Sequence, residues 1–585
     1  MLEKIKNRAI RLAMQAYMAT RRHSVTDGVV GIQLRRPKKA PHYSSEVLRA
    51  GSVQSKGASP LPVDIQVERD VPVRLRDGTT IYTDVFRPTG ADRVPAVVAW
   101  SPYGKTEPFD SVAKPEQALS GLQKFEAADP GWWVPHGYAV IQPDIRGIGN
   151  SGGRFTQWGT QDGRDGYDLV EWIAEQSWSN GKVGFAGNSW LSISQWFIGA
   201  QRPPHLAALA PWEGFADVYR NTVAPGGVPS PEFAGMVPVV LRGRQYGEDL
   251  PAMVDRHPLM DDYWRDKIAA VERITVPTYV VSSYTNKVHT RGTIHAFNAL
   301  TVQDKWLRIH NIHEWRDFYR NQEDLLRFFD RYLKGVDNGW ESTPRVRMSV
   351  LDPGGEDETN IVTDSFPPPG TEPVRLYLTA NAGLSRDAQA AEASVAYTAD
   401  DGRSRAQFTM VFTEDTTIAG HWKLRLWVEA DGADDIDLFL QCQKLDAAGN
   451  VIPVIVKGAP YGDANGVGEF EWGHGVLRAS RRAVDDDRSS LFVPFHPFDR
   501  EQRLRRGETV PVEIEIWLEL NKIGVWRCDW EVLEVVVEGA VGDVGGEGRE
   551  GVLRGERAGV GDIVLGGVPH VFCGTQGRGR TGACS

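Results

Sequence analysis

The sequence is poor in cysteine, has no long apolar run and lacks an excess of positive charge. Its four cysteines offer neither a disulfide framework nor the spacing of a metal site, so we expect neither; they are Cys442, Cys528, Cys573 and Cys584. No apolar stretch approaches the roughly 18 residues of a membrane-spanning helix. The net charge of −11 argues against nucleic acid or an acidic membrane surface as the main partner, since both need a basic surface.

The length and composition predict a globular protein of more than one domain. The chain has 585 residues, 41% of them hydrophobic, and is too long for a single core. We therefore expect two or three domains in a soluble protein.

The two ends differ from the rest of the chain. Residues 1–45 carry ten Lys or Arg but only two acidic residues. Apolar side chains in this segment recur at helical spacing. Such a leader can be a mitochondrial transit peptide, or a surface helix followed by a flexible arm. We expect a cytoplasmic protein, with the mitochondrion as the alternative. Residues 539–585 include fifteen glycines, and we expect a disordered tail.

Between the ends, the pattern of apolar and polar residues changes once. Up to about residue 340, short β-like runs alternate with helical patterns, which indicates a parallel sheet covered by helices. The runs are residues 94–100, 138–142, 183–186, 277–283 and 306–310, and the helical patterns include 170–174, 193–200 and 325–333. Residues 213–272 interrupt this rhythm, as a cap inserted over an active site would.

Beyond two Pro/Gly-rich stretches, at 352–355 and 367–370, the strands alternate apolar and polar residues. This alternation is typical of an antiparallel sandwich. The expected organisation is a basic arm at 1–64, an α/β domain at 65–345, a β domain at 346–538 and the tail at 539–585.

Ser189 is the candidate nucleophile. It lies in the sequence Gly-Asn-Ser-Trp-Leu-Ser at 187–192, between a short apolar run and a helical pattern. A strand that turns sharply into a helix with Ser at its apex is the nucleophile elbow of α/β-hydrolases. The fit to Gly-x-Ser-x-Gly is imperfect, because Leu191 stands where the second Gly is expected.

Several motifs in order resemble the family of cocaine esterase and X-prolyl dipeptidyl aminopeptidase. They lie at residues 76–79, 84–88, 101–105, 144–153, 187–192, 328–335, 418–420, 424–427 and 434–438. The resemblance implies an α/β-hydrolase domain with a helical cap, followed by a C-terminal jelly-roll domain, and a reaction without metal or organic cofactor. Within the elbow, relatives have Gly where this chain has Ser192.

The resemblance also implies the donors that stabilise a tetrahedral oxyanion. They are the hydroxyl of Tyr103, in the Ser-Pro-Tyr loop, and the backbone N–H of Trp190, which follows the nucleophile.

The general base is expected to be a His beyond the strand at 306–310. Alignment with the Gly-Pro-Trp-x-His motif of the family places His313 at the catalytic position. His310, at the end of the strand, is the alternative, and we favour His313.

The acid of the triad departs from the family pattern. Relatives carry an Asp in a turn where this chain has Thr285 and Asn286, which can orient an imidazole but cannot offset its charge. A carboxylate from elsewhere could replace it, and Glu314, Glu213 and Asp217 all stay open.

The sequence thus predicts a serine hydrolase that cleaves an ester or amide through an acyl-enzyme at Ser189. Its partner would be a small ester, amide or short peptide, and homo-oligomerisation is left open. Because of the missing Asp, a catalytically degenerate relative that acts as a binding or scaffolding protein is the alternative. A third hypothesis is a carbohydrate-binding sandwich fused to an inactive α/β domain.

Overall fold

The computed structural model describes most of the chain between His23 and Val568. The residues left out within this span are 91, 106–117, 285, 287, 389–393, 400–404, 413–415, 419, 458–466, 471–472, 518–520, 524–531, 541–548 and 555–560. The basic leader up to residue 22 and the final residues from 569 therefore lie outside the described residues, as does Thr285.

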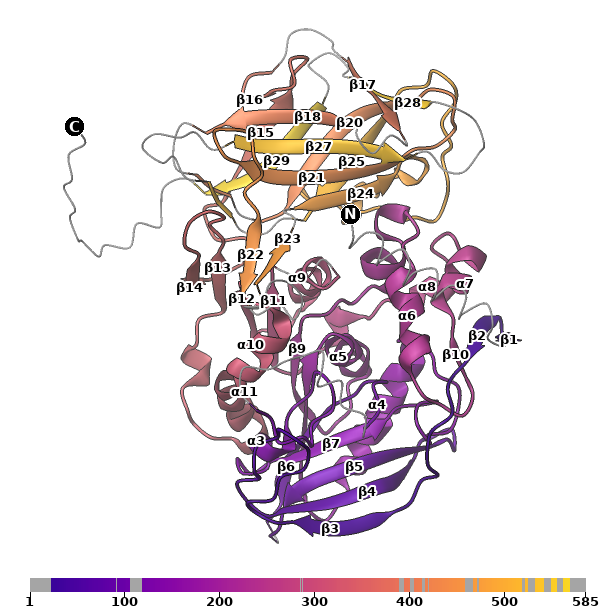
Figure 1. Ribbon diagram of the computed structural model, residues 1–585, viewed down its shortest axis with the longest axis vertical. Helices are drawn as coiled ribbons and strands as arrows, with labels where there is room; N and C mark the ends of the chain where they lie inside the picture. The colour runs from indigo at the N-terminus through magenta and orange to yellow at the C-terminus, as the bar shows by residue number, and fades with distance from the viewer. Residues whose placement is uncertain are drawn as a thin grey trace, which may run out of the picture.

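A sheet of eleven strands forms the first part of the molecule (Figure 1). Its strands, in spatial order, are β14 (Glu358–Thr363), β13 (Val346–Val350), β12 (Lys305–His310), β11 (Thr278–Ser283), β9 (Leu206–Trp212), β8 (Ser179–Asn188), β6 (Val94–Val98), β7 (Ala139–Asp144), β5 (Thr80–Pro88), β4 (Ile65–Arg74) and β3 (Ser44–Leu48). The five β-like runs predicted from the sequence overlap β6, β7, β8, β11 and β12.

The centre of this sheet is parallel and its edges are antiparallel. Strands β7, β6, β8, β9, β11, β12 and β13 are joined by parallel pairings, whereas β5, β4 and β3 on one side and β14 on the other pair antiparallel. The carboxyl ends of the parallel strands therefore meet at one edge. In open α/β sheets this is the edge at which ligands bind.

Helices lie against both faces of the sheet because successive strand residues point to opposite sides. Phe185 of β8 belongs to one core and the next residue, Ala186, belongs to the other. The first core includes side chains of α4 (Thr160–Ala174), α5 (Trp190–Gln201) and α9 (Thr290–Ala299). The second core includes side chains of α3 (Pro130–Trp133), α10 (Glu314–Arg320) and α11 (Gln322–Phe329). The predicted helices at 170–174, 193–200 and 325–333 are thus confirmed, the last continuing as the helical turn Asp330–Lys334.

Residues 213–272 leave the sheet and form a mostly helical segment. Two helical turns, Tyr219–Val223 and Pro225–Gly227, precede α6 (Glu232–Val240), β10 (Tyr246–Glu248), α7 (Leu250–Arg256) and α8 (Asp262–Arg265). Strand β10 pairs with β2 (Val29–Gln33), which pairs with β1 (His23–Thr26).

The prediction of a separate arm over residues 1–64 is therefore wrong for its described residues. Strands β1 and β2 attach to the helical segment and β3 forms an edge of the large sheet. The physical reason is that the edge strands β4 and β10 offer backbone groups with which these residues pair.

The C-terminal part is mostly β and lies above the first sheet in Figure 1. One sheet contains β15 (Glu372–Leu378), β16 (Leu384–Ser385), β17 (Ser394–Ala399), β19 (Thr416–Ile418), β20 (Trp422–Ala430), β25 (Val510–Ile516), β26 (Asn521–Ile523), β28 (Arg549–Arg554) and β29 (Gly561–Val568). A second contains β18 (Ala406–Val411), β27 (Val532–Ala540), β21 (Asp437–Leu445) and β24 (His474–Arg478), and β22 (Val454–Lys457) pairs with β23 (Val467–Phe470). Apolar side chains of both larger sheets share one core.

Two expected boundaries need correction. The large sheet continues through β13 and β14 to Thr363, so residue 345 is not its end, because β12 offers β13 a parallel partner. The tail expected to be disordered contributes β28 and β29, which pair with β17, β15 and β20. Apolar runs at 552–553 and 563–565 give these short stretches the strand propensity that the surrounding glycines lack.

None of the helices in the described residues combines the length and apolar composition needed to cross a bilayer.

Candidate active site

Ser189 occupies a strained turn between β8 and α5. Its backbone φ of 55° and ψ of −118° lie outside the regions that a residue with a side chain usually adopts. Its N–H donates to the carbonyl of Glu213 at 2.8 Å, which ties the turn to the end of β9. The strain and the strand-to-helix geometry fit the nucleophile elbow expected from the sequence.

The residues around Ser189 explain the imperfect elbow motif. A Cβ on Gly187, whose φ is 137°, would lie 2.5 Å from Leu191 Cδ2, so Leu191 fills the space that only a glycine leaves open. Ser192, which replaces the family's glycine, faces Gly214: a Cβ there would lie 2.4 Å from Ser192 Oγ. The extra side chains are thus accommodated by glycines on the facing segments.

His289 is the imidazole that faces the nucleophile. Its Nε2 lies 3.3 Å from Ser189 Oγ. It directly precedes α9, whose first residue is Thr290. Both side chains are buried, with Ser189 6% and His289 3% exposed. His289 was not among the residues expected from the sequence.

Glu314 completes a hydrogen-bonded chain from Ser189. His289 Nδ1 lies 3.0 Å from Glu314 Oε2, and Asn286 Nδ2 donates to the same oxygen at 2.7 Å. A carboxylate at Nδ1 favours the imidazole tautomer that carries its proton there, which leaves the Nε2 lone pair directed at Ser189 Oγ.

Three buried carboxyl groups lie at this site, Glu314 among them, and their pKa values shift in different directions or for different reasons. Burial tends to raise the pKa of Glu314, but the charge of His289 and the hydrogen bonds from His289 and Asn286 outweigh it and lower that pKa. Burial raises the pKa of Glu213, although His310 opposes this. Glu314 is therefore the group held ionised beside the imidazole.

The third carboxyl group, Glu126, lies behind the expected oxyanion donor. Burial and the charge of Glu314 raise the pKa of Glu126 well above its usual value. Trp315 Nε1 donates to Glu126 Oε1 at 2.7 Å, and the Tyr103 hydroxyl also interacts with Glu126.

Tyr103 and Trp190 both lie at the nucleophile. The Tyr103 hydroxyl interacts with the Ser189 side chain, and burial raises the pKa of this phenol, so it keeps its proton. Trp190 is the first residue of α5, where a backbone N–H has no acceptor within the helix. Both residues therefore lie at Ser189, and their role as oxyanion donors stays a prediction.

The structure does not place His313 or His310 as expected for a base. His313 Nδ1 accepts from the N–H of Trp315 at 3.3 Å and caps α10. His310 Nε2 lies 2.9 Å from Glu213 Oε1. Among the described residues, the imidazole within hydrogen-bond distance of Ser189 Oγ belongs to His289, because the turn after β11 reaches the elbow while His313 is held by its own helix.

The contacts of each candidate also distinguish the residues considered for the acid. The Nδ2 atom of Asn286, the expected orienter of the base, donates to Glu314 Oε2 and lies 2.9 Å from His289 Nδ1. Asp217 pairs with Arg220 at 2.7 Å. Glu314, one of the open alternatives, contacts the imidazole, but the imidazole is that of His289.

A weak sequence signal could have revealed His289. It lies four residues after Thr285, in the same turn after β11 in which relatives carry their Asp. Exchanging the two roles between neighbouring loops preserves the triad geometry, since both loops follow adjacent parallel strands.

Family models match both parts of the chain. Residues 77–251 match the X-Pro dipeptidyl-peptidase (S15 family), and residues 338–522 match the X-Pro dipeptidyl-peptidase C-terminal non-catalytic domain. A CocE/NonD family hydrolase from Staphylococcus aureus superposes with a TM-score of 0.81 at 30% identity, covering 91% of this chain and 100% of that one. The chain belongs to the CocE/NonD family of hydrolases. The resemblance seen in the sequence is thereby confirmed, as is the fold with a large, mostly β C-terminal part.

Other relatives are more distant or match over shorter segments. The cocaine esterase of Rhodococcus sp. (strain MB1 Bresler) is 35% identical over 167 residues, which are 28% of this chain and 27% of that protein. The alignment thus spans about a quarter of this curated relative. An α-amino acid ester hydrolase shares the fold, with a TM-score of 0.64 at 16% identity over 86% of this chain and 96% of the other.

Proposed function

We propose that this CocE/NonD family member is a serine hydrolase that cleaves an ester or amide through an acyl-enzyme, with Ser189 as nucleophile, His289 as base and Glu314 as acid. The observation that carries the proposal is the buried chain from Ser189 Oγ through His289 Nε2 and Nδ1 to Glu314 Oε2, with distances of 3.3 and 3.0 Å.

The chemistry of each step follows from this chain. Ser189 Oγ attacks the substrate carbonyl while its proton passes to His289 Nε2, and the imidazolium faces the ionised Glu314. The same proton goes to the departing alcohol or amine, leaving the acyl group on Ser189. Water then attacks the acyl-enzyme and gives its proton to His289. The acyl C–O bond to Ser189 breaks, the acid is released, and His289 returns the proton to Ser189 Oγ.

The negative charge of the tetrahedral intermediate would fall between the Tyr103 hydroxyl and the Trp190 N–H. Tyr103 can serve as a donor because burial raises the pKa of its hydroxyl, which therefore keeps its proton. A neutral Glu126, favoured by its own raised pKa, adds no negative charge next to the oxyanion.

For the architecture, we propose an α/β-hydrolase domain with residues 213–272 as a helical cap and a C-terminal jelly-roll domain that begins after Thr363. The pairing of β13 and β14 with the first sheet supports this boundary. A cleft of about 550 Å³ runs beside the proposed cap, and its lining includes Tyr103, Lys39, Leu241 and Arg242.

The substrate class is a small ester, an amide or a short peptide. The degenerate-relative alternative rested on a missing carboxylate, and the contact of Glu314 with His289 counts against it. The net charge of −11 argues against nucleic acid as a partner.

A fluorophosphonate probe combined with a substrate panel tests this proposal. We expect the probe to label Ser189, and Ser189→Ala to abolish both labelling and hydrolysis, on the order of a millionfold in turnover, while circular dichroism stays unchanged. The panel comprises short-chain esters, aminoacyl amides and X-Pro amides. Full activity of Ser189→Ala, or no labelling of the folded wild-type protein, would overturn the mechanism.

Glu314→Gln tests the acid separately. The amide retains the shape but offers no charge to the imidazolium, so we expect turnover to fall by about ten-thousandfold. Measured turnover within tenfold of wild type would show that another group holds His289.

A further inference from the structure

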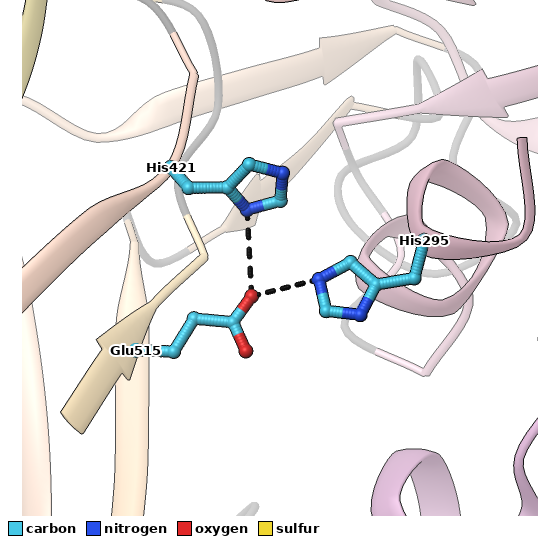
Figure 2. A group of neighbouring side chains, drawn as sticks. All are labelled: His295, His421 and Glu515. Carbon is cyan, nitrogen blue, oxygen red and sulfur yellow. Dashed lines mark hydrogen bonds and ion pairs between the residues drawn. The ribbon is translucent and has the colours of Figure 1, made fainter. Parts of the chain in front are cut away.

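Three side chains from distant parts of the sequence converge between the two parts of the molecule (Figure 2). His295 lies in α9, His421 directly precedes β20 and Glu515 lies in β25. Figure 2 shows both imidazole rings directed at the same carboxylate oxygen. His295 Nε2 lies 2.9 Å and His421 Nδ1 lies 3.4 Å from Glu515 Oε1.

This convergence has the dimensions of a zinc site. Zinc binds imidazole nitrogen at about 2.0–2.1 Å and carboxylate oxygen at about 2.0–2.2 Å, so tetrahedral ligand atoms lie about 3.3 Å apart. The two nitrogen-to-oxygen distances bracket that value, and all three ligand atoms lie within 4.8 Å of one another. Only small movements of the side chains would place a cation equally close to all three.

We propose that His295, His421 and Glu515 bind a divalent transition metal, with Zn²⁺ as the best fit. Imidazole and carboxylate ligands suit zinc, and a water molecule would complete a four-coordinate site.

The surroundings of Glu515 support this role. Its other oxygen, Oε2, accepts hydrogen bonds from Arg291 Nε at 2.9 Å and Nη2 at 2.6 Å. The guanidinium stacks over Trp517 at 5.3 Å, which fixes its position. Ligating carboxylates are commonly held by such an outer partner, and here Arg291 leaves Oε1 directed at the two imidazoles.

The site is sheltered but reachable. The side chains of His295, His421 and Glu515 are 29%, 11% and 6% exposed, so the cluster is largely shielded from solvent and His295 is its most exposed member. A small cation can enter from the His295 side. Partial burial also favours metal binding, since fewer waters compete for the ion.

The bound metal would have a structural consequence. Helix α9 begins at Thr290, next to His289, and its residue His295 would be tied through the metal to β25 and to the residue before β20 in the C-terminal part. The metal would therefore stabilise the contact between the two parts and the helix that carries the proposed base. No sequence pattern indicated this site, because the cysteines lack the spacing of metal ligands and His295, His421 and Glu515 span 220 positions of the chain.

The test uses tag-free, chelator-treated full-length protein and Zn²⁺ alone as the probe. Equilibrium dialysis followed by elemental analysis is expected to give about one Zn²⁺ per chain, with a higher Tm in the presence of the metal. His295→Ala and His421→Ala should each lower the affinity by at least tenfold and remove the Tm shift.

Two control variants make the result specific. His205→Ala removes an exposed histidine that pairs with Glu171 at 2.8 Å, and it should bind Zn²⁺ like wild type. His289→Ala matters because His289, Glu213 and Glu314 form a second group of ligand atoms within 4.8 Å.

Retention of the tight site in His289→Ala supports the proposal, and its loss there would assign the metal to the hydrolytic site instead. The proposal is overturned if wild-type protein binds no Zn²⁺, or if His295→Ala and His421→Ala bind it unchanged. Co²⁺ provides a second reading, because its visible absorption in a tetrahedral site should disappear in His421→Ala. None of these measurements requires hydrolysis, so they stand apart from the proposed reaction.

Discussion

At the scale of single residues, the pKa values around Ser189 distinguish three carboxyl groups that look alike in the sequence. Burial acts on Glu126, Glu213 and Glu314 in the same direction, and all three are at most 6% exposed. Glu314 differs because it contacts His289 and Asn286, whose charge and hydrogen bonds lower its pKa. The partner of an imidazolium has to be ionised, and the contacts of Glu314 meet that need.

Tyr103→Phe is expected to reduce turnover by about a hundredfold or more, the usual cost of removing one oxyanion donor. The substitution removes only a hydroxyl, and the ring keeps its edge-to-face contact with Phe125 at 5.1 Å. The comparison of kcat with the thermal unfolding temperature checks this. An unchanged kcat would mean that the Tyr103 hydroxyl has only a structural role.

The residue scale also shows where sequence reasoning succeeded and failed. Ser189, Tyr103 and Trp190 were expected from local motifs, which follow β8 and β6 at the carboxyl edge of the parallel strands. The base could not be predicted in this way. Alignment with a family motif assumes that each position of the motif keeps its role, and at this site the proposed roles of two positions are exchanged. Here the turn after β11 supplies the histidine and the loop after β12 supplies the carboxylate.

At the scale of elements, the elbow and the segment after β9 are fitted to each other. Gly214 leaves room for Ser192, the residue that replaces a glycine of the family motif. The apolar periodicity of the sequence predicted the strand and the helix on either side of Ser189 but could not reveal this fit, which depends on residues 22 positions apart in the chain.

Gly214→Ala is expected to lower the free energy of unfolding by about 1–3 kcal/mol, because the new methyl group would overlap Ser192 Oγ. The double variant Gly214→Ala with Ser192→Gly removes that overlap and should recover most of the loss. Denaturant unfolding of the two single variants and the double variant measures the coupling. Simple additivity of the two effects would contradict the proposed fit.

At the scale of the whole molecule, the C-terminal part holds the helical segment at 213–272. The buried Arg481 donates to Tyr219 Oη at 2.8 Å and to the carbonyl of Gly227 at 2.9 Å. Arg220 reaches back to the carbonyl of His496 at 3.0 Å. The order of the two parts along the chain was predictable from the change in the apolar pattern of their strands. The strands contributed by both ends were not, because isolated short runs between glycines carry too little pattern.

Acid stability tests the buried ion pairs that support the large sheet. Burial tends to raise the pKa of Asp317, but the charges of Arg308 and His310 lower it below the ordinary value of 3.8. A lowered pKa means that this carboxylate stabilises the fold above that ordinary value and loses its contribution as the pH falls through the folded-state pKa.

Asp317→Asn is therefore expected to destabilise the protein at pH 7 by about 3–5 kcal/mol, because Arg308 stays buried without its counter-charge. It should also weaken the dependence of stability on pH below 4. Asp262→Asn is the matched control, since the Asp262 side chain is 99% exposed and should change neither quantity. Tryptophan fluorescence during denaturant unfolding at several pH values gives both results. Equal pH dependence in Asp317→Asn and wild type would refute the linkage.

We propose that His289, and not His313, is the general base. Turnover of a short-chain p-nitrophenyl ester by His289→Ala and by His313→Ala tests it most directly, with circular dichroism to confirm that both variants fold. The contact of His289 Nε2 with Ser189 Oγ at 3.3 Å predicts that His289→Ala loses on the order of a millionfold in kcat, close to the loss in Ser189→Ala. His313→Ala, which removes a helix cap, should retain kcat within about tenfold. The opposite order of the two losses would contradict the account.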